Sequence, residues 1–323
     1  MSDIDVAIIG AGPTGLFAAY YAGFRGLSTV VVDALPEPGG QITAMYPEKL
    51  IFDVAGFPAV RGRELVANLV EQAAQYSPVY RLGAQAGALA YAGERPVLSL
   101  SDGESYTCGA VIITGGLGSF KPRPLPAADV FTGQGLVYFV PHLADLAGHD
   151  VVIVGGGDSA FDWALALHDV AASVTLVHRR DKFRAHAATV DRVRALPVSI
   201  LVNSQVTKIV GNGVVEAVEI SGPDGTRTHK ATVIVAALGF TADLGPIATW
   251  GLALDKRHVT VDSMMATNLP RVFAAGDIVE YPGKVRLIAT GFGEAATAVN
   301  NAAVVINPDA HLFPGHSSGG SAD

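Results

Sequence analysis

A glycine-rich loop with the sequence GAGPTG, at residues 10–15, is the stretch in which residue types and spacing most plainly suggest chemistry. It separates an apolar run from a run of helix-forming residues, and a second apolar run then ends on an acid, Asp33. Glycines let the backbone approach a pyrophosphate, which binds the N–H groups and positive dipole of a helix N-terminus. A carboxylate about 20 residues further on accepts hydrogen bonds from a ribose diol. This order predicts a dinucleotide site, although the loop alone is also compatible with an ordinary strand-to-helix turn.

A second glycine loop, GGGDSA at residues 155–160, repeats the pattern later in the chain. An apolar run precedes it, a helix-like run follows it, and a returning apolar run leads to His178. Asp33 lies 23 positions after Gly10 (33 − 10), and His178 lies 23 positions after Gly155 (178 − 155). The residue in the place of the ribose-binding acid is therefore a histidine. The chain contains an internal repeat of one strand–helix–strand unit rather than a solenoid period.

The residues around His178 predict which dinucleotide the second loop binds. A carboxylate at this position would repel the 2′-phosphate of NADP, whereas guanidinium groups can bind that phosphate bidentately. Two arginines follow His178 directly and a third comes a few residues later. We therefore expect NADP(H) in preference to NAD(H), with a solvated basic turn as the alternative. The predicted NADP(H) contacts are Gly155, Gly157, Asp158, Ser159, His178, Arg179, Arg180 and Arg184.

The first loop keeps its acid and therefore suits a dinucleotide with a free ribose diol, either FAD or NAD. Two nucleotide-binding units in one chain, one of them of the NADP type, imply a flavoprotein that moves hydride from NADPH to FAD. Asp277 follows Gly276 at the end of a late apolar strand. A carboxylate there can bind the ribityl hydroxyls of a flavin, and a simple strand-end turn is the alternative.

Length and composition place these two units on an α/β framework. The chain has 323 residues, more than one core usually holds, and it is 50% hydrophobic and 16% charged, with 37 glycines. We expect two Rossmann-like three-layer dinucleotide-binding domains, the second inserted in the first. The FAD domain would comprise residues 1–117 and 241–323, and the NADP(H) domain residues 118–240. A proline cluster at residues 121–126 marks the first boundary, and glycines near both boundaries are candidate hinges.

Simple counts argue against several other classes of protein. No run of about 18 continuous apolar residues is present, so we expect no membrane-spanning helix. The N-terminus lacks the basic region of a secretory signal, which predicts a cytoplasmic protein. A net charge of −8 disfavours a general nucleic-acid role. The one cysteine, Cys108, excludes an internal disulfide, a CxxC redox pair and a multi-cysteine metal site, so we expect it to be a buried small hydrophobe and expect no bound metal.

Together these segments resemble the thioredoxin-reductase-like class of ferredoxin–NADP(+) reductases, and the resemblance runs nearly end to end. Its most specific parts are residues 39–58, 155–163, 178–186, 273–277 and 291–295. The resemblance implies a homodimeric FAD enzyme that transfers hydride between NADPH and FAD, then exchanges single electrons with ferredoxin or flavodoxin. Such an enzyme needs no catalytic acid, base or nucleophile of its own, because the chemistry takes place on the flavin.

The resemblance also assigns individual residues to the flavin. Tyr46 would stack on one face of the isoalloxazine, and His316 would cover the other face across the dimer interface. Composition alone would instead place His316 in a disordered terminus. The predicted FAD contacts are Gly10, Gly12, Thr14, Gly15, Asp33, Gln41, Tyr46, Ala86, Phe120, Asp277, His316 and Ser318.

The electron acceptor distinguishes this chain from other enzymes of the same fold. Thioredoxin reductases pass electrons through a CxxC in the NADPH domain, but the corresponding residues 138–143 read YFVPHL here. A dithiol relay within the chain is therefore impossible, and electrons must leave directly from the flavin. Because ferredoxins are usually acidic and this chain is too, docking would need a local basic patch. The candidates, which are equally compatible with scattered surface charge, are Lys49, Arg61, Arg63, Lys121 and Arg123.

Three functions are left open by the sequence. The first is reduction of ferredoxin or flavodoxin. The second is a diaphorase or oxidase activity toward a small acceptor such as a quinone, or oxygen. The third is a non-catalytic flavin-binding redox module.

Overall fold

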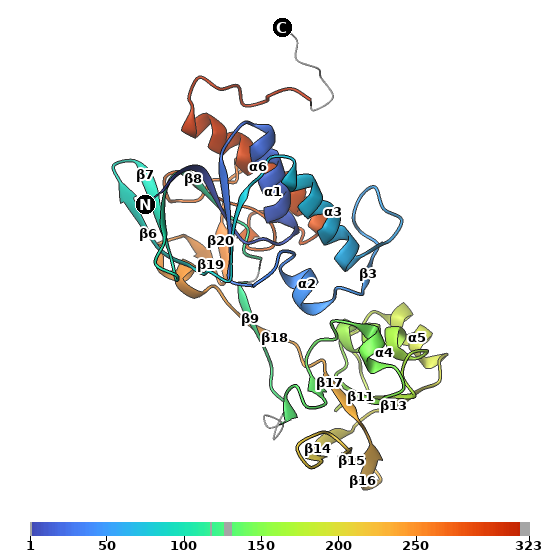
Figure 1. Ribbon diagram of the computed structural model, residues 1–323. Helices are drawn as coiled ribbons and strands as arrows, with labels where there is room; N and C mark the ends of the chain where they lie inside the picture. Colours follow the sequence, from blue (N-terminus) through green and yellow to red (C-terminus); the bar gives the residue numbers. More distant parts are fainter. Residues whose placement is uncertain (1, 117, 126–130, 317–323) are drawn as a thin grey trace. The chain divides into compact units, whose positions relative to one another are not determined.

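The computed structural model describes residues 2–116, 118–125 and 131–316 of the chain (Figure 1). The polypeptide divides into two compact units. The first comprises Met1–Ala44, Leu50–Phe120 and Ala242–Asp323, and the second comprises Met45–Lys49 and Lys121–Thr241. Most of the second unit is thus inserted in the chain of the first. Both units are α/β with parallel strands, which is the class that the sequence predicts.

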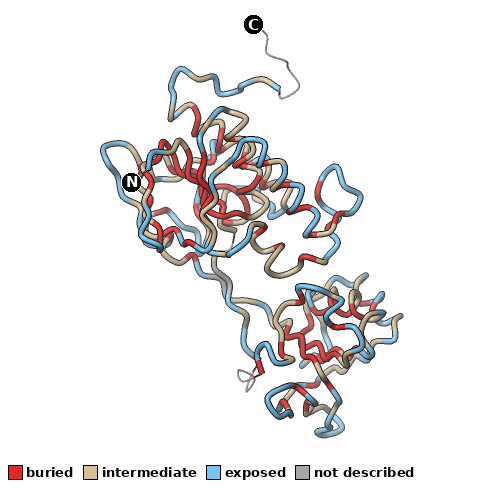
Figure 2. The backbone as a smooth tube through the Cα atoms, in the orientation of Figure 1, coloured by how far each residue is buried: buried red, intermediate tan, exposed pale blue. Residues whose placement is uncertain are grey.

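Among the described residues, the first unit is built on a seven-stranded sheet in the order β5-β2-β1-β8-β7-β6, with β21 also pairing with β8. β1 pairs in parallel with β2 and β8, whereas β7 and β6 continue the sheet as antiparallel strands. Val6, Ala7 and Ile8 of β1 are fully buried, because helices or strands cover both faces of an apolar parallel strand. Figure 2 colours the buried parts of the backbone red. The strands are β1 (Ser2–Ile9), β2 (Thr29–Asp33), β5 (Val79–Leu82), β6 (Ala86–Ala92), β7 (Arg95–Leu100), β8 (Ser105–Ile113) and β21 (Val272–Ala274).

Helices α1 (Pro13–Phe24), α3 (Gly62–Ala74) and α6 (Ile288–Ile306) pack in the first unit, with α1 in contact with both of the others (Figure 1). α1 begins directly after Gly12, whose backbone is extended, and Pro13 occupies the first helical position. Proline suits that position because its missing N–H has no partner there in any helix. Small buried residues such as Ala18 and Ala22 on α1 and Ala298 on α6 let these helices approach closely. The N-terminus of α1 is thereby held at the end of β1.

The second unit has a parallel sheet in the order β10-β17-β11-β12-β13. Alternate residues of β11 face opposite sides, as strand geometry requires. Val151 and Ile153 pack toward helices α4 (Asp158–Leu167) and α5 (Ala187–Arg194), whereas Val152 and Val154 belong to a core shared with the antiparallel strands β14 and β15. The strands are β10 (Leu136–Val137), β11 (Asp150–Val154), β12 (Ser173–Val177), β13 (Val198–Leu201), β14 (Gln205–Val210), β15 (Ala217–Gly222), β16 (Gly225–Lys230) and β17 (Val233–Ala236).

Two of the places where the chain crosses between the units, after Phe120 and after Thr241, lie side by side, because β9 (Ser119–Pro122) pairs with β18 (Phe240–Asp243). Gly118 and Gly239 flank these strands and have φ of +79° and +83°. Glycine adopts such angles without the strain that a side chain would cause. The glycines that the sequence marks as candidate hinges therefore stand at the crossings.

The segment after β2 differs from the prediction. Its lack of periodicity predicts a loop over residues 42–58, but α2 (Gln41–Met45) opens it with a short helix. β3 (Leu50–Ile51) then pairs with β4 (Val60–Arg61). Elements this short depend on tertiary packing, here the burial of Ile42 and Ile51, rather than on a local pattern. The other short elements of the first unit are η3 (Gly245–Thr249), β19 (Leu254–Asp255), β20 (His258–Thr260) and β22 (Val279–Glu280).

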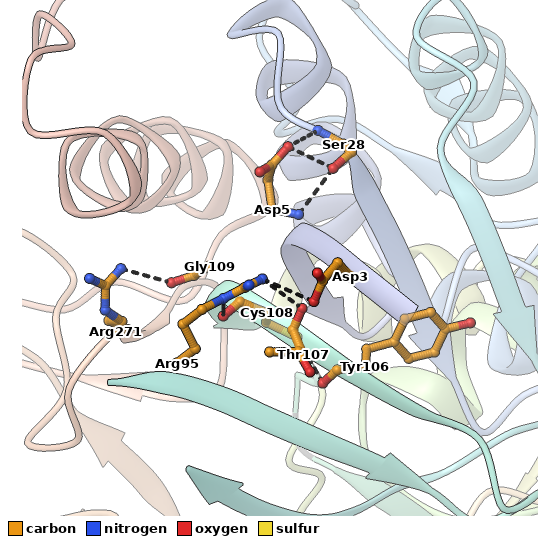
Figure 3. A network of polar contacts seen from close by, with 9 residues as sticks. All are labelled: Asp3, Asp5, Ser28, Arg95, Tyr106, Thr107, Cys108, Gly109 and Arg271. Atoms are coloured by element: carbon orange, nitrogen blue, oxygen red, sulfur yellow. Dashed lines mark hydrogen bonds and ion pairs between the residues drawn. The ribbon is translucent and has the colours of Figure 1, made fainter. Parts of the chain in front are cut away.

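Cys108 lies on β8 and is fully buried, so the prediction of a small buried hydrophobe is confirmed. Its carbonyl oxygen and that of Thr107 accept hydrogen bonds from Arg95 at 3.4 and 3.1 Å, and Arg95 also pairs with Asp3 (Figure 3). Burial raises the pKa of the Cys108 thiol to about 12. The thiol therefore stays protonated at neutral pH and is a poor nucleophile.

No helix in the part of the chain that the structure describes is long and apolar enough to cross a membrane. Within the same residues, no group of three or more His, Cys, Asp or Glu side chains is placed to hold a metal ion.

Candidate functional site

The first glycine loop lies between β1 and α1, and Asp33 lies against it. The Asp33 carboxylate accepts a hydrogen bond from Ala11 N at 2.6 Å and another from Leu35 N at 2.8 Å. Burial raises the pKa of Asp33, and these two N–H donors partly oppose that shift. The acid at the end of β2 is thus oriented by the backbone of the loop itself.

The three glycines of this loop have different surroundings. Gly10 has a φ of +110°, and a Cβ there would lie 2.7 Å from Thr114 O. A Cβ on Gly15 would overlap Gly10 O, because α1 packs tightly on the loop. Gly12, in contrast, has no atom within 4 Å of the place that a Cβ would occupy. Gly10 and Gly15 are therefore required by packing, whereas Gly12 leaves open space at the helix N-terminus, where a pyrophosphate can approach the backbone.

Strand pairing brings Asp277 to the same end of the first unit. β21 lies beside β8, and a Cβ on Gly276 would lie 2.9 Å from Thr14 Oγ1. Gly291, in the first turn of α6, packs against the same hydroxyl. Burial raises the pKa of Asp277, and nearby cations, above all Lys284, partly offset that rise. Thr14 and the Gly276–Asp277 turn therefore lie side by side.

Gln41 and Ala86 also lie close to this end of the sheet. Gln41 Nε2 is 3.1 Å from the place of a Cβ on Gly116, just beyond β8. Ala84 N donates a hydrogen bond to Asp33 O at 3.1 Å, and the buried Ala86 starts β6 two residues later.

Among the described residues, the structure does not bring the remaining predicted flavin contacts next to the first glycine loop. Tyr46 follows α2 and is half-buried, but it groups with the second compact unit. His316 is exposed, and its ring centroid lies 5.1 Å from that of Phe313. The side chain of Phe120 and the whole of Ser318 lie outside the described residues. The stacking roles of Tyr46 and His316 therefore stay predictions.

The second loop, between β11 and α4, repeats the arrangement of the first. A Cβ on Gly155 would lie 2.5 Å from Ala237 O, whereas Gly157 has no atom within 4 Å of a Cβ position. α4 begins at Asp158, directly after Gly157, as α1 begins directly after Gly12. Because each loop leaves open space in front of a helix N-terminus, both fit the pyrophosphate of a dinucleotide.

His178 lies against the second loop in the way that Asp33 lies against the first. Its imidazole ring would overlap a Cβ on Gly156, which corresponds to Ala11 of the first loop. The ring is half-buried, and this burial, with the charges of the neighbouring arginines, lowers the pKa of His178 below 6.5. The imidazole is therefore neutral at physiological pH, and the positive charge at this position belongs to the arginines.

The three arginines after β12 present exposed side chains beside this loop. The segment that carries them folds back on the loop, since Arg184 N donates to Gly156 O at 2.8 Å. His186 N donates to Asp158 Oδ1 at 2.9 Å, which ties the same segment to the first turn of α4, where Ser159 is also exposed. In the described part of the chain, no carboxylate forms an ion pair with Arg179, Arg180 or Arg184.

Two polar features of the first unit are missing from the predicted set of site residues. Thr114 Oγ1 donates toward the carbonyl oxygens of Ile9 and Gly10, at 3.0 and 2.9 Å, and so braces the loop from the end of β8. Glu294 and Lys284 form a buried ion pair in the same unit. The sequence offered one signal for each. Thr114 is a polar residue at the end of an apolar strand, and Glu294 is the single acid in the Gly- and Ala-rich run ATGFGEAATA.

Comparison with known proteins shows which family the chain resembles. The model of the pyridine nucleotide-disulphide oxidoreductase family matches residues 4–302. A ferredoxin–NADP reductase of Salinispora arenicola is 71% identical over 322 residues, which cover 99% of this chain and 100% of the relative. A ferredoxin–NADP reductase of Thermus thermophilus is 48% identical, covering 97% of this chain and 96% of the relative.

Among solved structures, the thioredoxin reductase of T. acidophilum matches with a TM-score of 0.80 and 27% identity, covering 94% of this chain and 98% of that one. The thioredoxin reductase of Lactococcus lactis matches with a TM-score of 0.78, covering 94% of this chain and 99% of that one. At 24% identity, the second match shows the fold alone.

Proposed function

The chain belongs to the pyridine nucleotide-disulphide oxidoreductase family, and from this premise we propose that it acts as an FAD-dependent ferredoxin–NADP(+) reductase. It is an oxidoreductase that uses FAD and NADP(H). The assignment of FAD to the first unit and NADP(H) to the second rests on one observation: which residue stands at the equivalent place beside each glycine loop. That residue is the hydrogen-bonded Asp33 in the first unit and His178, followed by arginines, in the second.

The first unit supplies the FAD site in this proposal. The pyrophosphate would approach the open side of Gly12 at the N-terminus of α1, and Asp33 would accept hydrogen bonds from the adenosine ribose. Asp277, beside Thr14, would bind the ribityl hydroxyls. The proposed FAD domain comprises residues 1–117 and 241–323, as expected from the sequence.

The second unit supplies the NADP(H) site, in a domain of residues 118–240. The open side of Gly157 and the N-terminus of α4 would receive the pyrophosphate. The exposed guanidinium groups beside the loop would bind the 2′-phosphate, because a planar fork of N–H donors matches phosphate oxygens bidentately. The neutral imidazole of His178 is compatible with such an anion, whereas a carboxylate in its place would repel it.

When bound, the flavin takes up a hydride and can release electrons one at a time. The chain's own residues bind and orient the two dinucleotides. The carboxylates of Asp33 and Asp277 accept hydrogen bonds from sugar hydroxyls, and the arginines hold a phosphate. None of these side chains is required to act as an acid, base or nucleophile.

The acceptor proposed is a one-electron carrier, ferredoxin or flavodoxin. The solved relatives include thioredoxin reductases, but Cys108 is the one cysteine of this chain and is fully buried. Neither a dithiol nor an exposed thiol is available to pass electrons to a disulfide. The curated relatives with 71% and 48% identity are ferredoxin–NADP reductases, which supports the same acceptor.

A homodimer and a cytoplasmic location complete the proposal. Beyond α6, Leu312 and Phe313 are 54% and 60% exposed, next to the exposed His316. Large apolar side chains in such a segment suit contact with a second copy of the chain, in which His316 would cover the flavin of the partner.

One coupled assay tests the function. The purified yellow protein should oxidise NADPH and reduce cytochrome c rapidly only when a purified ferredoxin or flavodoxin is added. Reduction at a comparable rate without the carrier would instead identify a diaphorase or oxidase. Bound FAD without NADPH oxidation would identify a non-catalytic flavin-binding module.

A further inference from the structure

A carboxylate and an ammonium group are buried together beside the Gly276–Asp277 turn, and the function proposed above uses neither. The side chain of Glu294, on α6, is 4% exposed and pairs at 2.5 Å with Lys284, whose side chain is fully buried. Glu294 Oε1 also accepts a hydrogen bond from Tyr281 Oη at 2.6 Å. Glu294 Oε2 accepts one from Gly276 N at 2.8 Å. The carboxylate therefore joins α6 and Lys284 to the backbone of the turn.

Stability alone does not account for this pair. Taking two charges out of water is costly, and replacement of a buried ion pair by apolar residues is often neutral or stabilising. The contacts of Glu294 indicate a local role instead, because one of its oxygens is used to hold a single backbone N–H, that of Gly276.

The turn that receives this hydrogen bond has an unusual conformation. Gly276 has a φ of +85°, and a Cβ there would lie 2.9 Å from Thr14 Oγ1. Glycine is needed for that angle, yet glycine also has access to many other angles. The hydrogen bond from Gly276 N–H to Glu294 restricts this freedom. The conformation of Gly276 in turn sets the direction in which the next side chain, Asp277, points.

We propose that Glu294 is a positioning residue of the FAD site, which acts through Gly276 N–H to fix the turn that presents Asp277. The contacts with Lys284 and Tyr281 hold the Glu294 carboxylate in the orientation that this bond needs. The inference rests on the proposed function, in which Asp277 binds the polyol chain of the flavin. Glu294 itself does not touch the cofactor.

The electrostatics of the turn agree with this arrangement. Burial is the main cause of the raised pKa of Asp277, but Lys284 lowers that pKa and Glu294 raises it. The three groups thus lie within electrostatic reach of one another. Paired with Lys284, Glu294 can stand near Asp277 without bringing an uncompensated negative charge to the site.

The first experiment measures FAD release from the purified holoenzyme by the rise in flavin fluorescence on dilution. Asp277→Asn and the charge-free double variant K284M/E294M, which has no acceptor for Gly276 N–H, should each raise the Kd for FAD about tenfold or more, the effect of losing one hydrogen bond to a charged group. The combined variant D277N/K284M/E294M should bind FAD no more weakly than D277N alone to within about twofold, because residues that act through one another are not additive.

The second experiment uses a matched pair of charge-free variants, K284M/E294Q and K284M/E294M. Both lack the buried charges and are expected to fold, which thermal unfolding checks. The glutamine variant keeps an acceptor for Gly276 N–H, and the methionine variant has none. FAD should bind about fivefold more tightly to the glutamine variant, and hydrogen–deuterium exchange in the peptide that contains Gly276 should be slower there.

The outcomes distinguish failure of the Glu294 positioning role from failure of the proposed FAD site. If D277N holds FAD as well as the wild type, the assignment of Asp277 to the flavin is wrong, and the positioning role is wrong with it. If D277N releases FAD but the two charge-free variants hold it equally, with equal exchange at Gly276, the flavin site stands and the role of Glu294 is overturned. An additive loss in D277N/K284M/E294M would also overturn it, since Glu294 would then act independently of Asp277.

Discussion

In both units a parallel strand runs into a glycine turn and a helix, and in both the second glycine of the motif, Gly12 or Gly157, has open space in front of it. The units differ beside the turn. In the first unit the Asp33 carboxylate accepts a hydrogen bond from the loop, and in the second the His178 ring lies against it. In the proposed function, the backbone of each loop makes a general cradle for a dinucleotide, and the residues at the end of the next strand select which dinucleotide binds.

Burial and charge differ between the two sites in a second way. Asp33 and Asp277 are removed from water strongly enough for burial to raise the pKa of each. The three arginines beside the second loop, Arg179, Arg180 and Arg184, are exposed, and no carboxylate among the described residues forms an ion pair with them. A site lined by buried, hydrogen-bonded acids suits a cofactor that stays bound. An exposed cationic edge suits a substrate that enters and leaves during each turnover, and its attraction for phosphate weakens as salt screens it.

The largest effect is expected where the two loops are alike. Gly12→Ala places a methyl group in the open space in front of α1 without a clash inside the protein, so it should block the pyrophosphate. We expect FAD affinity to fall at least about a hundredfold, the loss of two charge-assisted hydrogen bonds, as measured by flavin content and Kd. The matched variant Gly157→Ala should keep its FAD and raise the KM for NADPH instead. A fully flavinated G12A protein would contradict the role assigned to the open space.

The next largest effect is expected at the arginines beside the second loop, where the two loops differ. Replacing Arg179 and Arg180 together by alanine should raise the KM for NADPH about tenfold to a hundredfold, since each guanidinium contributes charge-assisted hydrogen bonds to the 2′-phosphate. The KM for NADH, which lacks that phosphate, should change far less. Lys182→Ala removes one charge from the same turn and is the control for general electrostatics. Equal changes in both KM values would rule out the assignment.

A smaller effect is expected at the acid of the first loop. In Asp33→Asn, one of the two backbone N–H groups of Ala11 and Leu35 loses its acceptor and faces an amide N–H instead. The stability of the protein should fall by about 1–3 kcal/mol in thermal unfolding, and FAD should bind about tenfold less tightly. Arg180→Ala, an exposed change in the second unit, should leave the melting temperature unchanged. A D33N protein with wild-type melting and wild-type FAD affinity would remove Asp33 from the site.

The smallest expected effect is a difference in pH dependence. Burial raises the pKa of Asp33 and Asp277 above the ordinary 3.8, so these carboxylates gain protons, and lose acceptor capacity, at a higher pH than an exposed Asp. As the pH falls, FAD release should therefore begin at a higher pH than the titration of an exposed Asp would predict. Burial lowers the pKa of His178 below 6.5, so this group is already neutral at about pH 7. The KM for NADPH should show no histidine titration between about pH 7 and 8, and a step there would show that His178 is charged in the free enzyme.

Much of the fold could be predicted because its signals are local. Strands such as β1 and β11 are continuous apolar runs that end in glycine turns, and equal spacing from each turn identifies Asp33 and His178 as counterparts. α2 and the β3–β4 pair could not be predicted, because two to five residues carry no measurable period. Cys108 could be placed in the core because it stands alone beside a long apolar strand.

The candidate site was less predictable where it depends on packing between distant segments. Glu294 and Lys284 are buried only because α6 closes over the turn after β21, and neither has a neighbour in sequence that marks it as paired. The bracing hydroxyl of Thr114 depends on β8 lying next to β1. The predicted stacking of Tyr46 and His316 on a flavin rests on the family resemblance, because no local pattern in the sequence specifies it.

The burial of Cys108 also makes this chain a convenient subject for spectroscopy. Its thiol is protonated and buried in the sheet around β8, so it should not react with maleimides or other alkylating probes under native conditions. A cysteine introduced at an exposed position in either unit would therefore take up a fluorophore or spin label without competition. Pairs of such labels, one in each unit, would report the distance between the two dinucleotide sites through a catalytic cycle, with no need to remove a native cysteine first.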